Sequence, residues 1–349
     1  MLPVAVAHAP RLQADRGRSG VRVKGNIGAM SMFRQVLSRD PGQLPSGIQG
    51  NACAIGWSCE GRLATATTSG EVLLADVDSH GNARVKSSFV AHGSKDGTEA
   101  LAWHPSDRNQ LATCSVDKSL KVWDVRSTNR AVQEHTSDGE NLNVNYSPDG
   151  HYIAMGSSKK ERNTETDILG IYDMRTKKKL KSVKFTILAH DYKWSPNGEY
   201  IINATETGSI DVMAFGSTKP LSRVRSTKLA HTAPCKALAI DPFNRYLASG
   251  GDDGLVSLWE LDDFVCVRTI ACEGEVRSLS FTPDGRFIAI SISGGGVEIA
   301  EVETAASAHS LPGAKSQAVE FHPKRPLLAG IASRPGRGDF GLRLWSFVC

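Results

Sequence analysis

The stretch Cys235–Trp259, CKALAIDPFNRYLASGGDDGLVSLW, contains three short apolar segments separated by turn sequences. The first segment ends at Ile240 before an Asp-Pro pair, and the second, Leu247–Ser249, precedes the residues Gly-Asp-Asp-Gly. The third ends at Trp259. Because proline fixes φ and glycine accepts a positive φ, these pairs favour tight turns. The stretch therefore predicts three short strands joined by tight turns.

The same unit recurs along the whole chain. In each copy, an apolar segment ends in a bulky residue and is followed by a short polar turn. The seven terminal residues are Trp57, Trp103, Tyr146, Trp194, Ile240, Phe281 and Phe321. They are 46, 43, 48, 46, 41 and 40 residues apart, which is the blade period of a β-propeller. We therefore predict an all-β fold, a seven-bladed propeller over residues 30–349, in which stacked blades bury each other's faces.

Two repeats contain the same polar residues at the same spacing. In each, a hydroxyl residue precedes an Asp by four positions and a Trp follows that Asp by six. The sets are His92, Thr113, Asp117 and Trp123 in the second repeat, and His231, Ser249, Asp253 and Trp259 in the fifth. They resemble the structural tetrad of the WD-repeat family, in which buried polar groups satisfy one another. We expect these residues to stabilise turns, and we expect blades one and six, which lack the turn Asp, to be looser.

The two ends of the chain are expected to close the ring. The last predicted strand, Leu342–Trp345, is the third of its blade, and only four residues follow it. The missing outer strand is expected from the N-terminal side, within Ser31–Ser38, because pairing there removes an open sheet edge.

The N-terminal segment differs from the rest of the chain in charge. Residues 1–29 contain five Lys and Arg residues and one Asp, whereas residues 30–349 contain 36 basic and 36 acidic residues. We expect the segment to be a disordered basic tail, the alternative being an organelle transit peptide. The balanced remainder argues against a dominant electrostatic attraction to nucleic acid.

One basic run stands out in the third repeat, where residues 174–190 contain no acid. Its members are Arg175, Lys177, Lys178, Lys179, Lys181 and Lys184. We expect them on the outer strand of the blade or in the loop before it, where lysines prevent unwanted strand pairing. A nuclear localisation patch or an RNA-backbone contact is the alternative. The preceding segment Ser157–Asp167, which is rich in charged and polar residues, is expected to be a mobile loop.

No catalytic or metal-binding pattern is found in the sequence. It lacks G-x-S-x-G, H-E-x-x-H and P-loop sequences, and its seven cysteines show no C-x-x-C spacing. No apolar run is long enough for a membrane-spanning helix. The triple glycine Gly294–Gly296 is expected to be a hairpin turn. We expect no enzyme activity, no metal, no cofactor and no small-molecule substrate, with a propeller hydrolase as the alternative.

Several segments differ from the general repeat pattern and distinguish among WD-repeat proteins. They are Gly139–Asn143, Leu255–Arg268, Val276–Phe281, Val297–Thr304 and His322–Ala329. All are similar to the THO complex subunit 3 family, and the resemblance runs from about residue 50 to 347. The tail, the Ser157–Asp167 segment and the Gly-rich turn of the sixth repeat depart from that family.

The resemblance implies a non-enzymatic scaffold subunit of the THO core of the transcription-export assembly. Its expected partners are other THO subunits, especially the large helical subunit, with indirect association with mRNA in the nucleus. Exposed charges beside turns are the expected partner contacts, because rigid scaffolds bind through their loops. These residues are Asp262, Asp263, Glu303, Lys324 and Arg325. The alternative is a WD-repeat adaptor of another nuclear complex, either chromatin-modifying or a ubiquitin ligase.

Overall fold

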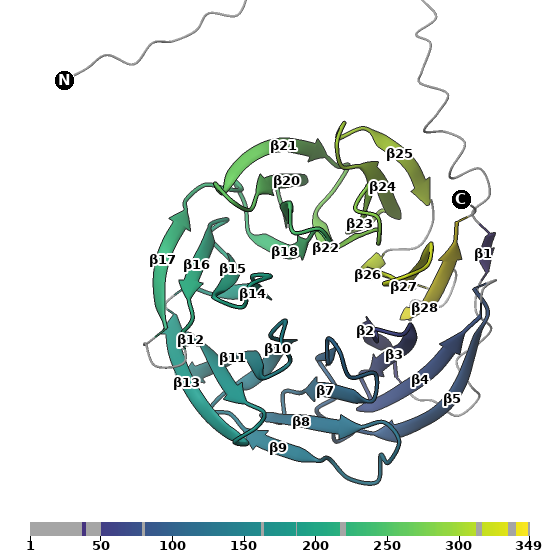
Figure 1. The fold of residues 1–349 in the computed structure, drawn as a ribbon, viewed down its shortest axis with the longest axis vertical. Coiled ribbons are helices and arrows are strands. Elements are labelled where there is room, and N and C mark those ends of the chain that lie inside the picture. The colour runs from purple at the N-terminus through teal and green to yellow at the C-terminus, as the bar shows by residue number, and fades with distance from the viewer. Residues whose placement is uncertain are drawn as a thin grey trace, which may run out of the picture.

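The strands of the protein form seven four-stranded sheets around a central axis, as Figure 1 shows. This computed structural model describes residues 37–39, 50–78, 81–161, 164–185, 187–216, 221–311, 316–333 and 340–347. The predicted seven-bladed propeller is therefore confirmed, whereas the predicted tail over residues 1–29 lies outside the described residues. Within the described ranges, no helix has the length and apolar character needed to cross a membrane.

Each blade is built from consecutive strands, numbered from the axis outward. Blades one and two contain β2 (Ala52–Trp57), β3 (Arg62–Thr67), β4 (Glu71–Val77) and β5 (Ala83–Val90), then β6 (Ala100–Trp103), β7 (Gln110–Cys114), β8 (Ser119–Asp124) and β9 (Gln133–Thr136). Blades three and four contain β10 (Glu140–Tyr146), β11 (Tyr152–Glu161), β12 (Thr164–Asp173) and β13 (Lys178–Phe185), then β14 (Ala189–Trp194), β15 (Tyr200–Thr205), β16 (Ile210–Ala214) and β17 (Ser222–Thr227).

The remaining three blades follow the same plan. Blades five and six contain β18 (Cys235–Ile240), β19 (Tyr246–Gly251), β20 (Leu255–Glu260) and β21 (Val265–Ala271), then β22 (Val276–Phe281), β23 (Phe287–Ile292), β24 (Val297–Glu301) and β25 (Ser307–Leu311). Blade seven contains β26 (Ser316–Phe321), β27 (Leu327–Ser333), β28 (Phe340–Ser346) and the N-terminal strand β1 (Leu37–Arg39). Gly294–Gly296 lies in the hairpin turn between β23 and β24, as predicted.

The ring is closed by the two ends of the chain. Strand β1 pairs antiparallel with β28, with Leu37 opposite Ser346 and Arg39 opposite Leu344. The predicted closing strand is thus confirmed, although its described part includes Arg39, one residue beyond the predicted range. Residues 31–36 of that range lie outside the described residues. The pairing covers the edge of β28 that would otherwise be open.

The seven bulky residues identified from the repeat spacing end the innermost strands of the seven blades. Three of the tryptophans also bind the neighbouring blade. The Nε1 atoms of Trp57, Trp103 and Trp194 donate to the backbone oxygens of Glu320, Gly56 and Asn145 at 3.0, 2.9 and 3.3 Å. A buried indole needs such an acceptor. These bonds therefore connect adjacent inner strands, including the junction between blades seven and one.

The apolar core lies between neighbouring blades. For example, Leu258 of blade five shares one buried cluster with Ile288 and Ile290 of blade six. Each blade buries its faces against the next, so no blade has a complete core of its own.

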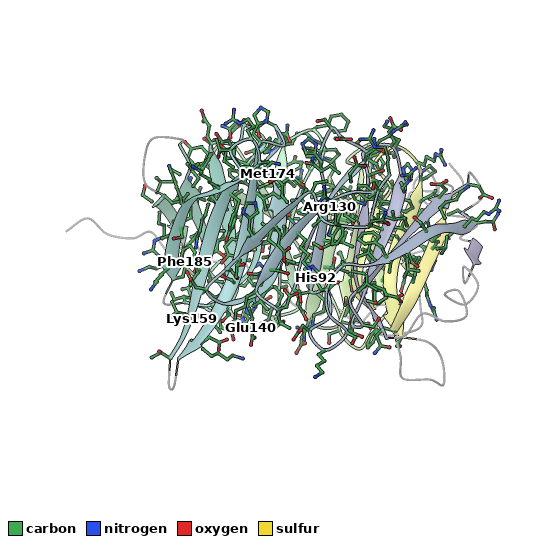
Figure 2. The ribbon with its side chains drawn as sticks, turned by 90° about the horizontal axis from the view of Figure 1, so that it is seen from below. His92, Arg130, Glu140, Lys159, Met174 and Phe185 are labelled. Carbon is green, nitrogen blue, oxygen red and sulfur yellow. The ribbon has the colours of Figure 1, made fainter. Side chains whose placement is uncertain are left out.

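The segment Ser157–Asp167 is not the predicted loop. Strands β11 and β12 continue through it as a long hairpin, with Ser158 opposite Asp167 and Lys160 opposite Glu165. Figure 2 shows this hairpin, with Lys159 near its tip, extending past the other blades at the end opposite Met174. Backbone pairing forms these strands and does not require apolar side chains, so composition misled the prediction.

Candidate functional site

The second blade brings its four predicted polar residues together. The Nε2 and Nδ1 atoms of His92 lie 2.9 Å from Thr113 Oγ1 and 3.0 Å from Asp117 Oδ2. Trp123 Nε1 donates to the same Thr113 oxygen at 2.9 Å. Ser119, which was not predicted, bonds both the Asp117 carboxylate at 2.6 Å and His92 Nδ1 at 3.0 Å. A continuous hydrogen-bonded chain therefore links the β7–β8 turn to the inter-blade loop.

The fifth blade repeats this arrangement. His231 Nε2 lies 2.7 Å from Ser249 Oγ, which accepts from Trp259 Nε1 at 2.9 Å. His231 Nδ1 lies 3.1 Å from Asp253, whose carboxylate also accepts from the backbone nitrogen of Thr232 at 2.9 Å. Burial alone would raise the pKa of Asp253, but the hydrogen bonds from Thr232 and His231 outweigh it and hold the pKa below its usual value. The carboxylate is thus kept charged as a hydrogen-bond acceptor.

Neither chain has the surroundings of a catalytic site. The imidazole of His92 is fully enclosed, and its burial lowers its pKa. The hydroxyl at the other end accepts the indole N–H, so it is held as a hydrogen-bond partner and is not presented to a substrate. The hydrogen bonds of both tetrads connect turns and loops on one face of the propeller.

The charged turns of blades five and six meet on the opposite face. Glu303, in the β24–β25 turn, forms ion pairs with Arg245 at 3.4 Å and Arg268 at 3.0 Å. Asp262 and Asp263 are exposed in the β20–β21 turn, where the neighbouring Leu261 nitrogen donates to the Arg245 oxygen at 3.0 Å. Three of the five predicted contact residues therefore lie in turns on this face of blades five and six, and we call this area the blade 5–6 surface.

Phe243 completes the blade 5–6 surface and was missed from the sequence. Its side chain is 61% exposed in the β18–β19 turn. The Arg245 guanidinium lies 5.6 Å from its ring centroid and 5.3 Å from that of Tyr246. Arg245 is also held by the buried Asp241 carboxylate at 3.0 Å. An exposed aromatic ring on a rigid support is the usual anchor of a protein interface. The sequence feature that could have identified this residue is its position directly after the Asp-Pro pair of the β18–β19 turn.

The other two predicted contacts lie apart from this surface. Lys324 and Arg325 are exposed in the β26–β27 turn, and their backbone nitrogens donate to His322 Nδ1 at 3.0 and 3.1 Å. Arg325 Nη1 donates to the Val77 oxygen of blade one at 3.1 Å. Burial, together with these two cations, lowers the pKa of His322 to about 4. The turn therefore fixes the junction of blades seven and one, where we keep Lys324 as a proposed contact.

The predicted basic run lies on the outer edge of blade three. Lys178, Lys179, Lys181 and Lys184 belong to β13, and Arg175 and Lys177 lie in the turn before it. Two of them are neutralised, because Arg175 pairs with Asp173 at 3.4 Å and Lys179 with Asp138 at 3.7 Å. Nearby carboxylates therefore neutralise only part of the positive charge of the run.

The inner strands surround a central cavity of about 680 Å³. Charged side chains on its wall include Asp191, Lys193, Arg277 and Glu320. The Trp57 nitrogen donates to Glu320 Oε1 at 3.3 Å, but enclosure in the cavity raises the pKa of Glu320 to about 7. Near neutral pH this carboxyl is therefore divided between its protonated and charged forms.

Glu320 predicts a pH dependence of folding. Between its ordinary pKa of 4.5 and the folded value of about 7, the folded chain retains a proton that the unfolded chain releases. Stability should therefore fall as pH rises through this window and remain lower above it. We expect Glu320→Gln to be more stable than the parent by about 1–2 kcal/mol at about pH 8, and to be equal to it at about pH 4. Denaturant unfolding at both values checks this, and an equal pH dependence of the two proteins would count against it.

The described residues contain no group of three or more His, Cys, Asp or Glu side chains that could hold a metal ion. Their six cysteines are free thiols, and burial raises the pKa of Cys114 and of Cys235. Such thiols are protonated and unreactive at neutral pH.

Family comparisons agree with the blade structure. A family model described as "WD domain, G-beta repeat" matches residues 83–124 and 222–260, and "Anaphase-promoting complex subunit 4 WD40 domain" matches residues 257–324. Each WD-repeat match starts with an outer strand, β5 or β17, and ends with the third strand of the next blade, β8 or β20. The sequence repeat is thus offset from the blade by one strand, which is why the last blade needs β1.

A full-length relative then decides the family. THO complex subunit 3 of Arabidopsis thaliana is 35% identical over 279 residues, which cover 79% of this chain and 84% of the relative. This chain belongs to the THO complex subunit 3 family. That membership confirms the resemblance predicted from Leu255–Arg268 and Val297–Thr304.

Other relatives of this THO complex subunit 3 family member share less with it. WD repeat-containing protein AAC3 of Dictyostelium discoideum is 30% identical over 304 residues, covering 81% of this chain but 62% of that relative. Protein hir1 of Schizosaccharomyces pombe is 25% identical, covering 58% of this chain and 25% of its own length. In these relatives the matched region is only part of a longer protein.

Proposed function

We propose that this chain is the non-enzymatic WD-repeat scaffold subunit of a THO complex and acts in nuclear mRNA packaging and export. The observation that carries the proposal is its likeness to THO complex subunit 3 along 84% of that relative. The enclosed tetrads support a scaffold, because the polar side chains that resemble a catalytic set are used to fix turns.

The blade 5–6 surface is the proposed site for the large helical THO subunit. Phe243 supplies an exposed aromatic anchor, and Asp262 and Asp263 supply exposed carboxylates in the β20–β21 turn of the same blade. Glu303 is better described as the internal partner of Arg245 and Arg268, which orients the surface. A partner helix with an apolar stripe flanked by basic residues fits this combination.

Substitutions on the blade 5–6 surface test this assignment. We expect Phe243→Ala to weaken association with THO subunits by about 2 kcal/mol or more, because an aromatic anchor carries much of the binding energy. We expect the double reversal Asp262→Lys and Asp263→Lys to weaken it less and mainly through slower association. Co-purification from cells expressing each variant measures the effect.

The matched control is Tyr200→Ala, because Tyr200 is an aromatic residue at the start of β15 in blade four and is 37% exposed. All variants should retain the melting temperature of the parent within a few degrees. If Phe243→Ala and the double reversal both retain THO subunits at the level of the control, another surface makes the contact. If the parent captures no THO subunit, the adaptor alternative replaces the proposal.

A further inference from the structure

The balanced charge of the propeller conceals a strong local asymmetry. The sequence from residue 174 to 240 contains twelve Lys and Arg residues but four Asp and Glu residues. Because residues 30–349 are balanced overall, the rest of the propeller, including the inner three strands of blade three, carries the compensating acids. The excess positive charge is therefore concentrated on the outer strands of blades three and four and not on these blades as a whole.

Besides the run on β13, the outer strand of blade four, β17, contributes to this excess of positive charge. Residues 212–240 contain no acid, and Arg223, Arg225 and Lys228 are all exposed. Only the run on β13 was predicted from the sequence, because the basic residues of β17 alternate with other side chains. Two neighbouring outer strands are thus basic.

Side-chain contacts join these strands into one band. Lys181 Nζ donates to the Gly216 oxygen of blade four and lies 5.4 Å from the Phe215 ring centroid. In the same way, Arg225 Nη1 donates to the Asp263 oxygen of blade five at 3.0 Å. Figure 1 shows β13 and β17 following one another along the rim. We call the exposed basic residues of β13 and β17, with Lys177 and Lys228 beside them, the rim band.

Much of the charge in the rim band is uncompensated. Arg223 pairs with Asp211 at 3.1 Å, as Arg175 and Lys179 pair with their own carboxylates. Among the described residues, no carboxylate lies within ion-pair distance of the ammonium groups that remain. These belong to Lys177, Lys178, Lys184 and Lys228.

Protection of the sheet edge does not require so many charges. Blade five leaves Val265 and Val267 of its outer strand β21 exposed at 52% and 40%, with Cys266 exposed between them. The basic residue of β21, Arg268, is paired with Glu303, so edge protection would call for a free lysine on β21 at least as much as on β13. The accumulation on β13 and β17 therefore needs another explanation.

We propose that the rim band binds the sugar-phosphate backbone of single-stranded RNA directly. Protein interfaces are depleted in lysine and built around aromatic anchors, whereas the large exposed apolar residues of this band are the aliphatic Leu180 and Val224. Surface lysines without an anchor suit a polyanion, held electrostatically and without sequence preference. The choice of RNA as the polyanion rests on the proposed function. The existence of the positive surface does not depend on that function.

Direct binding of RNA by the purified full chain tests the rim band. The variant Lys178→Gln, Lys184→Gln and Lys228→Gln removes three uncompensated charges, two from β13 and one from the turn after β17. Its affinity for a short polyuridine RNA should fall by about tenfold, and the slope of log affinity against log salt should decrease by about 2. The matched control is Arg84→Gln, Lys86→Gln and Lys95→Gln, which removes three exposed charges from blade one and its outer loop.

Two outcomes would overturn the proposal. One is that the rim-band variant binds RNA with the affinity and salt slope of the control variant. The other is that it binds RNA like the parent but no longer accumulates in the nucleus, which would make the lysines a localisation signal. Because this assay uses the isolated chain, its failure leaves THO membership untouched, and failed co-purification with THO subunits leaves RNA binding untouched.

Discussion

Asp253→Ala should lower the free energy of unfolding by about 1–3 kcal/mol, because it leaves buried hydrogen-bond donors without an acceptor. The side chain of Asp253 is 7% exposed, and its carboxylate contacts His231 at 3.1 Å and the Thr232 nitrogen at 2.9 Å. The pKa of Asp253 is lowered in the folded chain, so its contribution is present above the ordinary pKa of 3.8 and is lost as pH falls through the folded value. Thermal and denaturant unfolding at neutral pH measure the loss.

The corresponding change in blade two, Asp117→Ala, should lower the free energy of unfolding by a smaller amount. Asp117 is 21% exposed, and Ser119 Oγ remains 3.0 Å from His92 Nδ1 as a second partner. The matched control is Asp262→Ala, which removes an exposed carboxylate from blade five. An Asp253→Ala protein that unfolds with the parent and the Asp262→Ala control would contradict the structural role of the tetrad.

Removal of the closing strand β1 should lower the free energy of unfolding by as much as Asp253→Ala does, or by more. A chain that starts at Gln43 lacks β1, so β28 loses the pairing of Leu37, Ser38 and Arg39 with Ser346, Trp345 and Leu344. We expect a loss of about 1–4 kcal/mol from the missing backbone bonds, together with aggregation through the exposed edge of β28.

The control for this truncation is a chain that starts at Met30, which removes only the predicted tail. It should unfold like the full chain and remain monodisperse. Calorimetry and light scattering on both truncations measure stability and association. Equal stability of the two truncated chains would show that β1 does not close the ring.

The blade architecture could be predicted because it is encoded locally. A bulky residue before a Pro or Gly turn ends each inner strand, and this pattern survives differences between repeats, so Trp57 and Phe321 were both placed correctly. The tetrads could be predicted for the same reason, since four-residue and six-residue spacings along β7–β8 and β19–β20 fix which side chains meet.

Features that depend on how blades meet were not accessible from sequence. The exposure of Phe243 follows from the path of one turn, and the raised pKa of Glu320 follows from closure of the cavity by seven inner strands. The basic strand β17 was missed because its charges alternate with other side chains, and they become neighbours of those on β13 only in the ring. The β11–β12 hairpin was missed because its strands depend on backbone pairing.

Affinity purification of the tagged full chain from nuclear extracts, with quantitative identification of bound proteins, tests THO membership most directly. We predict that THO subunits, including the large helical subunit, are recovered in stoichiometric amounts with the parent and are depleted with Phe243→Ala. Recovery of a different stoichiometric complex, or of no THO subunit from extracts in which that complex is intact, would contradict the proposed function.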